Sequence, residues 1–355
     1  MTFARSRSDM SSQGDVPERE PHPISRRLCN PENGQKFRVN GVEYRLAGKL
    51  GDGAAGLVRR ATRIPDNQEF AVKFLAPDPK YIDEAVFDDV ANRFRREGQR
   101  GAQLFHQNLV KIHAYDDNEY GHAFPSGGPK NPFMLMEIVK GTTLESHIKR
   151  DERRHSEKNE RKAFVLTPER LSIAAHVAEA LQYLHQSRLV HRDIKPANIF
   201  LPTDTAVSLQ RPAKLGDFGI MKWGDFHASV TTGTLTVTSQ QGLGTLKYMS
   251  PEQAISPRDV TIRSDIFSLG ITLLEVFTGQ ILASPHHVFE VINARLSRGT
   301  TASRFLGMGY DIAPQDLGIG ELVLDMHLRQ SGRPPIDRIL GRLKSEWERR
   351  ADQEW

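Results

Sequence analysis

Short stretches in which apolar and polar residues alternate follow one another from about residue 37 onward. This alternation predicts β-strands, and a turn at 65–68, "PDNQ", separates two of them. A helical stretch is expected over roughly 83–105, followed by two more strands in "LVKIHAY" and "PFMLMEIV". The polar segment between these two strands, within 116–132, is predicted to be a loop, and the sequence assigns it no role.

The pattern becomes helical after Gly141. Thr167 suits an N-cap with Pro168 at the first helical position, and apolar residues then recur at helical spacing. The stretch "SDIFSLGITLLEVFTG" is apolar nearly all round, which is typical of a helix buried in the centre of a lobe. A final amphipathic helix is expected in "PPIDRILGRLKSEWERR".

These patterns predict an α+β fold with two lobes, a small β-rich N-lobe with one helix and a larger α-helical C-lobe. We expect the N-lobe over about 37–136, a hinge over 137–141 and the C-lobe over 142–348, with a cleft between the lobes. Residues 1–36 are polar and contain several prolines, so they are predicted to be a disordered tail, and 349–355 form the C-terminal end.

Composition narrows the class of protein further. The chain has 355 residues and no apolar run long enough for a membrane helix, and its N-terminus lacks the apolar core of a secretion signal. One cysteine excludes an internal disulfide framework and fits a reducing compartment, so we expect a cytoplasmic location. The 48 basic side chains barely exceed the 44 acidic ones, which gives no reason to expect a nucleic-acid partner or a membrane partner.

A glycine-rich stretch, "LGDGAAGLV", lies between the first strands. Gly51, Gly53 and Gly56 would let the backbone approach phosphate oxygens without side chains in the way. A dinucleotide site would need a helix directly afterwards, whereas "LVRRATRIPD" reads as a strand that runs into a turn. Taken alone, the stretch could equally be a hairpin that binds nothing.

Lys73 in "AVKF" and Glu97 in the predicted helix lie 24 residues apart. Each taken alone is more simply a surface charge. A helix packed on the sheet could nevertheless bring this carboxylate to the ammonium group and hold it against a nucleotide phosphate.

The stretch "VHRDIKPANIF" packs several charged or amide side chains among apolar residues, where unpaired burial would be costly. Asp193 could accept a proton from an attacking hydroxyl or hold it in line, and Lys195 could neutralise charge on a transferring phosphoryl group. Asn198 and Asp217, the latter in "KLGDFG", offer the amide and carboxylate oxygens of a partial Mg²⁺ ligand set.

In this order the motifs resemble the eukaryotic-type protein serine/threonine kinase family over roughly 40–345, leaning towards its bacterial-type branch. The resemblance implies a protein-kinase-like fold and the cofactors ATP and Mg²⁺. It makes Asp193 the catalytic base, pairs Lys73 with Glu97, and assigns the metal to Asn198 and Asp217. It also implies an ATP site made of Leu50, Gly51, Gly53, Gly56, Val58, Ala71, Lys73, Met136, Glu137, Val139, Asn198 and Asp217.

Further motifs carry the resemblance into the C-lobe. "GTLKYMSPE" is similar to the segment that seats the acceptor peptide, where Thr245 would contact Asp193 and Lys195. Glu252 would pair with Arg333, and Asp265 would hold the backbone of the catalytic loop. Lys195 together with Thr245 is typical of kinases that act on serine and threonine.

Arg192 raises a regulatory hypothesis. An arginine beside the catalytic aspartate commonly binds a phosphorylated residue in the segment between Asp217 and Glu252, and Thr238 or Ser239 lies closest to the usual position. A phosphate there would accept charge-assisted hydrogen bonds from the arginine and order the segment. The alternative is that a segment rich in serine and threonine is only a loop.

The main departure from the family concerns the predicted helix of Glu97. Gly101 stands where the family has a bulky apolar residue that stacks on the motif phenylalanine, here Phe218, and Gly98 lies in the same helix. Each glycine costs a helix roughly 1 kcal/mol relative to alanine. We therefore predict a loosely held helix that needs a partner, a phosphate or a local repacking to bring Glu97 to Lys73.

The expected function is transfer of the γ-phosphate of ATP to protein substrates, with self-association for autophosphorylation in trans. The alternative is a pseudokinase, a nucleotide-binding interaction module without transfer activity. A second charged segment, 149–162, is expected to be a solvated extension.

Overall fold

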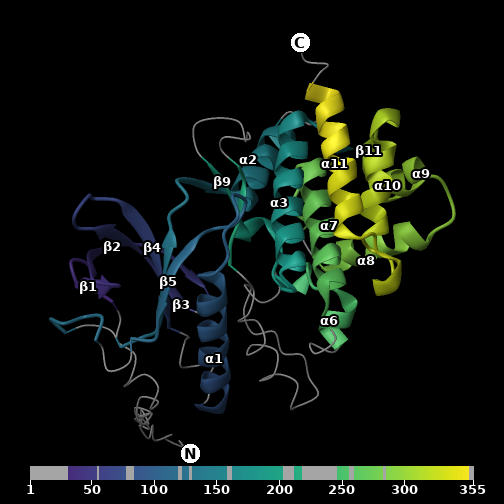
Figure 1. The fold of residues 1–355 in the computed structure, drawn as a ribbon. Helices are drawn as coiled ribbons and strands as arrows, with labels where there is room; N and C mark the ends of the chain where they lie inside the picture. The colour runs from purple at the N-terminus through teal and green to yellow at the C-terminus, as the bar shows by residue number, and fades with distance from the viewer. Residues whose placement is uncertain are drawn as a thin grey trace, which may run out of the picture.

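The computed structural model describes residues 31–53, 56–76, 84–118, 122–127, 130–157, 162–202, 212–217, 246–255, 260–282 and 285–351. These residues form two lobes, a β-sheet lobe with one long helix and a larger helical lobe (Figure 1). The predicted α+β, two-lobed architecture is therefore confirmed.

The N-lobe is built on a single antiparallel sheet of six strands. Its order is β1-β2-β3-β4-β6-β5, and the strands span Lys36–Val39, Val42–Gly53, Gly56–Arg63, Glu69–Leu75, Phe133–Glu137 and Ile112–Asp116 in that order. The strand β6 lies between β4 and β5, so that the strand that precedes the hinge runs through the interior of the sheet.

The helix α1, Glu84–Gly101, lies beside this sheet (Figure 1). It ends at Gly101, four residues before the predicted end at 105, since a turn follows directly. Val90 and Phe94 of α1 are buried in one cluster with Met134 of β6, which places the helix on one face of the sheet. Lys73 lies opposite Met134 and therefore projects from this same face.

The opposite face of the sheet is covered by aromatic residues and by part of the 116–132 segment. Phe124 is buried there, stacks on Phe37 at a ring separation of 5.4 Å and contacts Phe133. The segment predicted as a polar loop thus contributes to the hydrophobic core. The described structure begins at residue 31, upstream of the expected start at 37. Arg59 on β3 donates hydrogen bonds to the carbonyl oxygens of Pro31 and of Ala47 on β2, and it thereby ties this upstream segment to the sheet.

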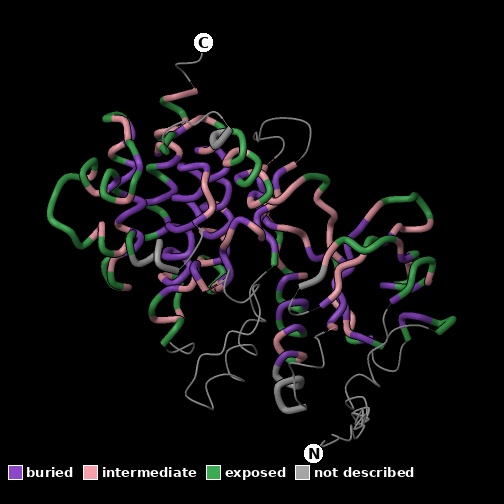
Figure 2. Tube along the Cα trace, turned by 180° about the vertical axis from the view of Figure 1, so that it is seen from behind, coloured by how far each residue is buried: buried purple, intermediate pink, exposed green. Residues whose placement is uncertain are grey.

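The C-lobe is organised around two buried helices. The first is α3, Pro168–Gln186, with Thr167 as its N-cap and Pro168 in its first turn, as predicted. The second is α7, Ile262–Thr278, which Thr261 caps at the N-terminus and Gly279 ends in a left-handed conformation with φ of 66°. The buried apolar residues of both helices belong to one core cluster. Buried segments fill the interior of this lobe (Figure 2).

The remaining described elements of this lobe surround that core or carry the catalytic loop. Its other helices are α2 (Leu144–Glu157), α6 (Pro251–Ile255), α8 (Pro285–Leu296), α9 (Thr301–Gly307), α10 (Leu317–Asp325) and α11 (Ile336–Ala351). Short strands are β7 (Gly141–Thr143), β8 (Ala163–Phe164), β9 (Ile199–Pro202), β10 (Lys214–Leu215) and β11 (Asp311–Ile312), and 3-10 turns span Pro196–Asn198, Pro314–Asp316 and Gln330–Gly332. Among the described residues, no helix combines the length and the apolar character that crossing a membrane requires.

Candidate active site

A buried aspartate on α7 holds the loop that contains residues 191–193, "HRD". Asp265 is fully buried, and its carboxylate accepts hydrogen bonds from the backbone amides of His191 at 2.9 Å and Arg192 at 2.8 Å. The predicted role of Asp265 as the anchor of this loop is therefore confirmed. His185 at the end of α3 is a further partner, 2.9 Å from the same carboxylate, which sequence reasoning missed because nothing in the local pattern links it to α7.

Asp193 is buried, with its carboxylate held by the residues that follow it in the loop. The Asn198 side-chain amide donates to the Asp193 carbonyl oxygen at 2.8 Å and to its Oδ2 at 2.9 Å. Lys195 Nζ lies 3.2 Å from the same Oδ2. These contacts fix the rotation of the carboxylate and set a cation beside it.

Lys73 on β4 is shared between two carboxylates. Its Nζ lies 3.4 Å from Glu97 Oε1 on α1 and 2.5 Å from Asp217 Oδ1. Lys73 and Glu97 are both buried, so water screens this pair little. The predicted approach of Glu97 to Lys73 is confirmed, and the structure adds that Asp217 is the nearer of the two carboxylates.

Burial governs the protonation of this cluster. It raises the pKa of Glu97 to about 7, although the Lys73 ammonium acts in the opposite direction. Burial would lower the pKa of Lys73, but the Asp217 and Glu97 carboxylates outweigh it and raise that pKa. Glu97 Oε2 is buried without a hydrogen-bond partner, which adds to the cost of ionising this carboxyl.

Backbone pairing brings the segments that carry Asn198 and Asp217 together. The strands β9 and β10 pair through Ile199 and Leu215, and the Gly216 amide donates to the Asn198 carbonyl oxygen at 2.9 Å. Asp217 therefore follows directly after a residue bonded to Asn198, and its φ of 57° turns the chain there.

This donor set fits Mg²⁺. The two described hydrogen bonds of the Asn198 side-chain amide nitrogen both go to Asp193. The Asn198 side-chain oxygen and the Asp217 carboxylate are the oxygens that these segments would offer to a cation. Mg²⁺ prefers one or two such protein oxygens and completes its shell with phosphate and water.

The glycine-rich stretch forms the end of the β2–β3 hairpin. Gly53 pairs with Gly56, and Gly51 pairs with Val58, which in turn lies opposite Lys73 on β4. Only a glycine fits at position 56, because a Cβ there would overlap the Phe74 carbonyl group. The hairpin tip at Gly56 thus lies two residues along β3 from Val58, the residue opposite Lys73.

The other residues expected to hold the nucleotide lie on β2, β4 and β6 and in the stretch that follows β6. Ala71 is buried and pairs with Met136 on β6, Leu50 is exposed on β2, and Glu137 ends β6. Val139 follows in the unpaired stretch that leads to β7, as expected of a hinge.

Glu252 and Arg333 form the predicted pair across the lower part of the C-lobe. Arg333 Nη1 lies 2.5 Å from Glu252 Oε1, and Nη2 donates to Oε2 at 2.9 Å. Burial acts to raise the pKa of Glu252, but the Arg333 guanidinium holds that pKa down at about 2. Thr245, Phe218, Thr238 and Ser239 lie outside the described residues.

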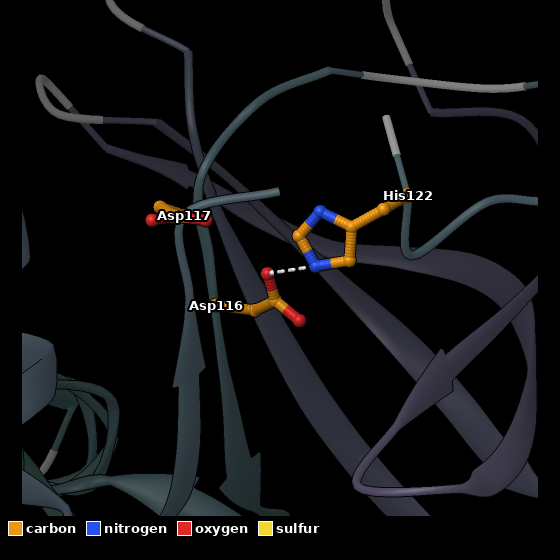
Figure 3. Close-up of side chains that lie close together, drawn as sticks. All are labelled: Asp116, Asp117 and His122. Atoms are coloured by element: carbon orange, nitrogen blue, oxygen red, sulfur yellow. Dashed lines mark ion pairs between the residues drawn. The ribbon is translucent and has the colours of Figure 1, made fainter. Parts of the chain in front are cut away.

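A separate cluster lies on the 116–132 segment (Figure 3). His122 Nε2 lies 3.0 Å from Asp116 Oδ1, and Asp117 is close enough that the three could share a metal ion. Asp117 and His122 are exposed, and Asp116 also accepts from the Asn118 amide at 2.7 Å. Side chains already paired in this way explain the cluster, and we assign it no ion.

Comparison with known proteins agrees with this geometry. A family model described as "Protein kinase domain" matches residues 44–304. The chain is 34% identical over 242 residues to the serine/threonine-protein kinase PknB of Mycobacterium leprae, covering 67% of this chain and 32% of that protein. It is 32% identical over 244 residues to the serine/threonine-protein kinase PrkC of Bacillus subtilis, covering 69% of this chain and 31% of that protein.

The chain thus spans under a third of the length of these relatives. Among solved structures, the Mycobacterium tuberculosis PknI kinase domain aligns with a TM-score of 0.57 at 21% identity, over 89% of this chain and 98% of that one. That similarity supports the fold. Since the family model covers most of the chain and the predicted pairs are in place, this chain belongs to the protein kinase domain family.

Proposed function

We propose that this chain is an ATP- and Mg²⁺-dependent protein serine/threonine kinase. The observation that carries the proposal is the arrangement around Asp193, whose carboxylate contacts Asn198 and Lys195 within 3.2 Å. A buried carboxylate fixed beside a cation suits proton transfer in a phosphoryl transfer reaction. The names of the bacterial relatives support the choice of serine and threonine as acceptors.

In the proposed reaction, a serine or threonine hydroxyl of the substrate attacks the γ-phosphorus of ATP. A new oxygen–phosphorus bond forms, the bond from the γ-phosphorus to ADP breaks, and ADP leaves with the electron pair. Asp193 accepts the hydroxyl proton or holds the hydroxyl in line, and Lys195 offsets charge on the transferring group. Mg²⁺ held by Asn198 and Asp217 would neutralise charge on the phosphates.

Lys73 is proposed to bind the nucleotide phosphates. Its contact with Glu97 joins β4 to α1 and would hold the ammonium towards the glycine-rich hairpin. The 2.5 Å contact with Asp217 would give way when phosphate oxygens and Mg²⁺ arrive, since both groups have partners there.

The alternative of a pseudokinase has less support. A binding module would not need a carboxylate at Asp193, yet this group is present and held in place. The glycine-containing α1 was the reason to consider this alternative, and in the structure that helix does bring Glu97 to Lys73.

We also propose that Arg192 couples activity to phosphorylation of Thr238 or Ser239. The backbone of Arg192 is fixed at both ends, because its amide donates to Asp265 at 2.8 Å and its carbonyl oxygen accepts from Gln253 at 3.2 Å. Its φ of 67° sets it in a left-handed turn beside Asp193. A guanidinium carried on such a fixed turn suits a phosphate ligand. Protein substrates and self-association for trans-autophosphorylation complete the proposal.

The test is transfer of label from γ-labelled ATP with Mg²⁺ by the purified chain and by Asp193→Asn, followed by mapping of phosphosites. We expect label on serine or threonine in the wild type and a loss of about 10²–10⁴-fold in the variant, the range of general-base contributions. Nucleotide binding without label in the wild type would favour the pseudokinase.

A further inference from the structure

The contact between α1 and β5 involves a glycine whose missing side chain is replaced by a tyrosine ring. A Cβ built at Gly98 would overlap Tyr115, lying 2.7 Å from its Cγ and 2.8 Å from its Cβ, with Cδ2 nearer still. Real Cβ atoms essentially never approach other atoms so closely. The Tyr115 ring therefore occupies the space that a side chain at position 98 would fill, and we call this contact the Gly98 socket.

The ring of Tyr115 is also held by the preceding turn of α1. Phe94, which lies four residues before Gly98 and hence on the same helix face, contacts the ring edge-on at a separation of 6.2 Å. The Arg95 guanidinium acts to lower the pKa of the Tyr115 hydroxyl, but burial outweighs it. Burial raises the pKa of that hydroxyl, so it stays neutral at physiological pH.

A cross-strand row links this socket to the catalytic pair. Lys73 on β4 lies opposite Met134 on β6, and Met134 lies opposite Tyr115 on β5. Directly opposed residues project from the same face of a sheet. Lys73 and Tyr115 thus stand in one row on the face that α1 covers, and they engage the consecutive helix residues Glu97 and Gly98.

A β-bulge puts Tyr115 in this row. The pairing of β5 with β6 passes from Ile112 opposite Met136 to Ala114 opposite Leu135, which leaves His113 as an extra residue. Ile112 and Tyr115 are three residues apart and would face opposite ways in a regular strand. With the bulge, both pack with the core on the α1 side.

We propose that Tyr115 is a positioning residue for Glu97. Its ring, inserted at Gly98, sets the rotation and the distance of α1 at which the Glu97 carboxylate reaches Lys73. Removal of the ring would let the helix shift at the residue next to Glu97, without touching nucleotide or acceptor. The expected effect of Tyr115 on reaction rate rests on the kinase activity proposed above. The expected effect of Tyr115 on the position of α1 rests on the contacts alone.

The test uses the full chain and the variants Tyr115→Ala, Tyr115→Phe, Gly98→Ala and Gly98→Ala/Tyr115→Ala. Tyr115→Ala should lower kcat/KM for ATP about tenfold, as for strongly coupled neighbours, while Tyr115→Phe, which keeps the ring, should stay within about twofold of the wild type. Gly98→Ala should also lose about tenfold, because its methyl group meets the ring. In the Tyr115→Ala background the same substitution should have no further effect, since the ring is gone.

Two further measurements separate positioning from a general loss of structure. In a Glu97→Gln background, Tyr115→Ala should lower kcat/KM for ATP little further, because the ion pair that Tyr115 positions is already absent. A full tenfold loss in that background would overturn the proposal. Hydrogen exchange of the amides in 94–101 needs no activity, and it should rise in Tyr115→Ala but not in Tyr115→Phe.

The outcomes distinguish the two proposals. If the wild type transfers no phosphate but exchange in α1 rises only when the ring is removed, the kinase proposal fails and the positioning of the helix by Tyr115 stands. If the wild type is active while Tyr115→Ala matches it in both rate and exchange, the positioning role is wrong.

Discussion

Glu97 carries a buried carboxylate that must be ionised to attract Lys73, yet burial favours its protonated form. Its pKa of about 7 lies well above the 4.5 of the unfolded chain. The folded protein therefore binds more protons than the unfolded one between these values, and stability falls as the pH rises from 4.5 to 7. Activity should change in the opposite direction, because the ionised group holds the lysine.

We predict that kcat/KM for ATP rises with pH through a midpoint near 7, and that Glu97→Gln removes this rise and lowers the plateau about 10–100-fold. Kinetics measured from about pH 5.5 to about pH 9 check this. Glu145→Gln, which alters an exposed carboxylate paired with Lys149, should keep the wild-type profile. A wild-type profile that is flat across this range would contradict the assignment.

At the scale of the element, α1 contains two glycines with opposite expected behaviour. Gly98 is required by the approach of Tyr115, whatever it costs the helix in propensity. Gly101 is the buried last residue of α1, where the family has a bulky apolar side chain. Glu97 contacts Lys73 in the structure, and the need for a partner, a phosphate or a local repacking stays a prediction.

We predict that Gly101→Leu raises basal autophosphorylation a few-fold and stabilises the chain by up to about 1 kcal/mol, the difference in helix propensity between the two residues. Initial rates and thermal unfolding measure the two effects. Gly98→Ala, which improves propensity by a similar amount, serves as the matched control and should lose activity. An unchanged or reduced rate in Gly101→Leu would count against a loosely held helix.

The catalytic loop is an element with a fixed backbone and a proposed phosphate ligand. Replacement of both Thr238 and Ser239 by alanine should lower activity by about tenfold or more after preincubation with ATP, since the proposed phosphate can no longer reach Arg192. Arg192→Lys should lose part of this activation, because lysine cannot form a bidentate pair. Mass spectrometry with rate measurements checks both variants, and full activity of the double alanine variant would end the hypothesis.

At the scale of the whole molecule, the Glu252–Arg333 pair ties the region after the acceptor segment to the chain beyond α10. The pKa of Glu252 falls from 4.5 in the unfolded chain to about 2 in the fold. A lowered pKa contributes stability that is complete above about pH 4.5 and is lost as the pH falls towards 2. A shift of this size corresponds to about 3 kcal/mol.

We therefore predict that Glu252→Gln destabilises the protein by about 2–4 kcal/mol at about pH 7 and by much less near pH 3. Urea unfolding at several pH values measures this difference. Asp66→Asn removes a carboxylate whose pKa is also lowered to about 2, but its pair with Arg63 is exposed and should contribute little. If the free energy of unfolding depended on pH equally in the two variants, burial of the Glu252–Arg333 pair would add nothing to stability.

The candidate site residues and the order of the elements that carry them could be predicted from the sequence. Asp193, Lys195 and Asn198 lie within one short loop, so their contacts follow from local spacing. The pairs of Lys73 with Glu97 and of Glu252 with Arg333 join distant segments, and they were predicted because the motifs resemble a known family.

The contacts that hold α1 on the sheet could not be predicted from the sequence. In a regular strand, successive residues project from alternate faces of the sheet, so the face of each residue can be predicted from its position. The bulge at His113 interrupts this alternation and brings Tyr115 onto the side of the sheet that α1 covers. Because Gly98 has no side chain, the sequence gives no indication that a tyrosine ring packs against it. Phe124 is buried, but the polar residues around it in the sequence do not predict a core segment. These contacts depend on which surfaces meet in three dimensions, and the order of residues along the chain does not encode that locally.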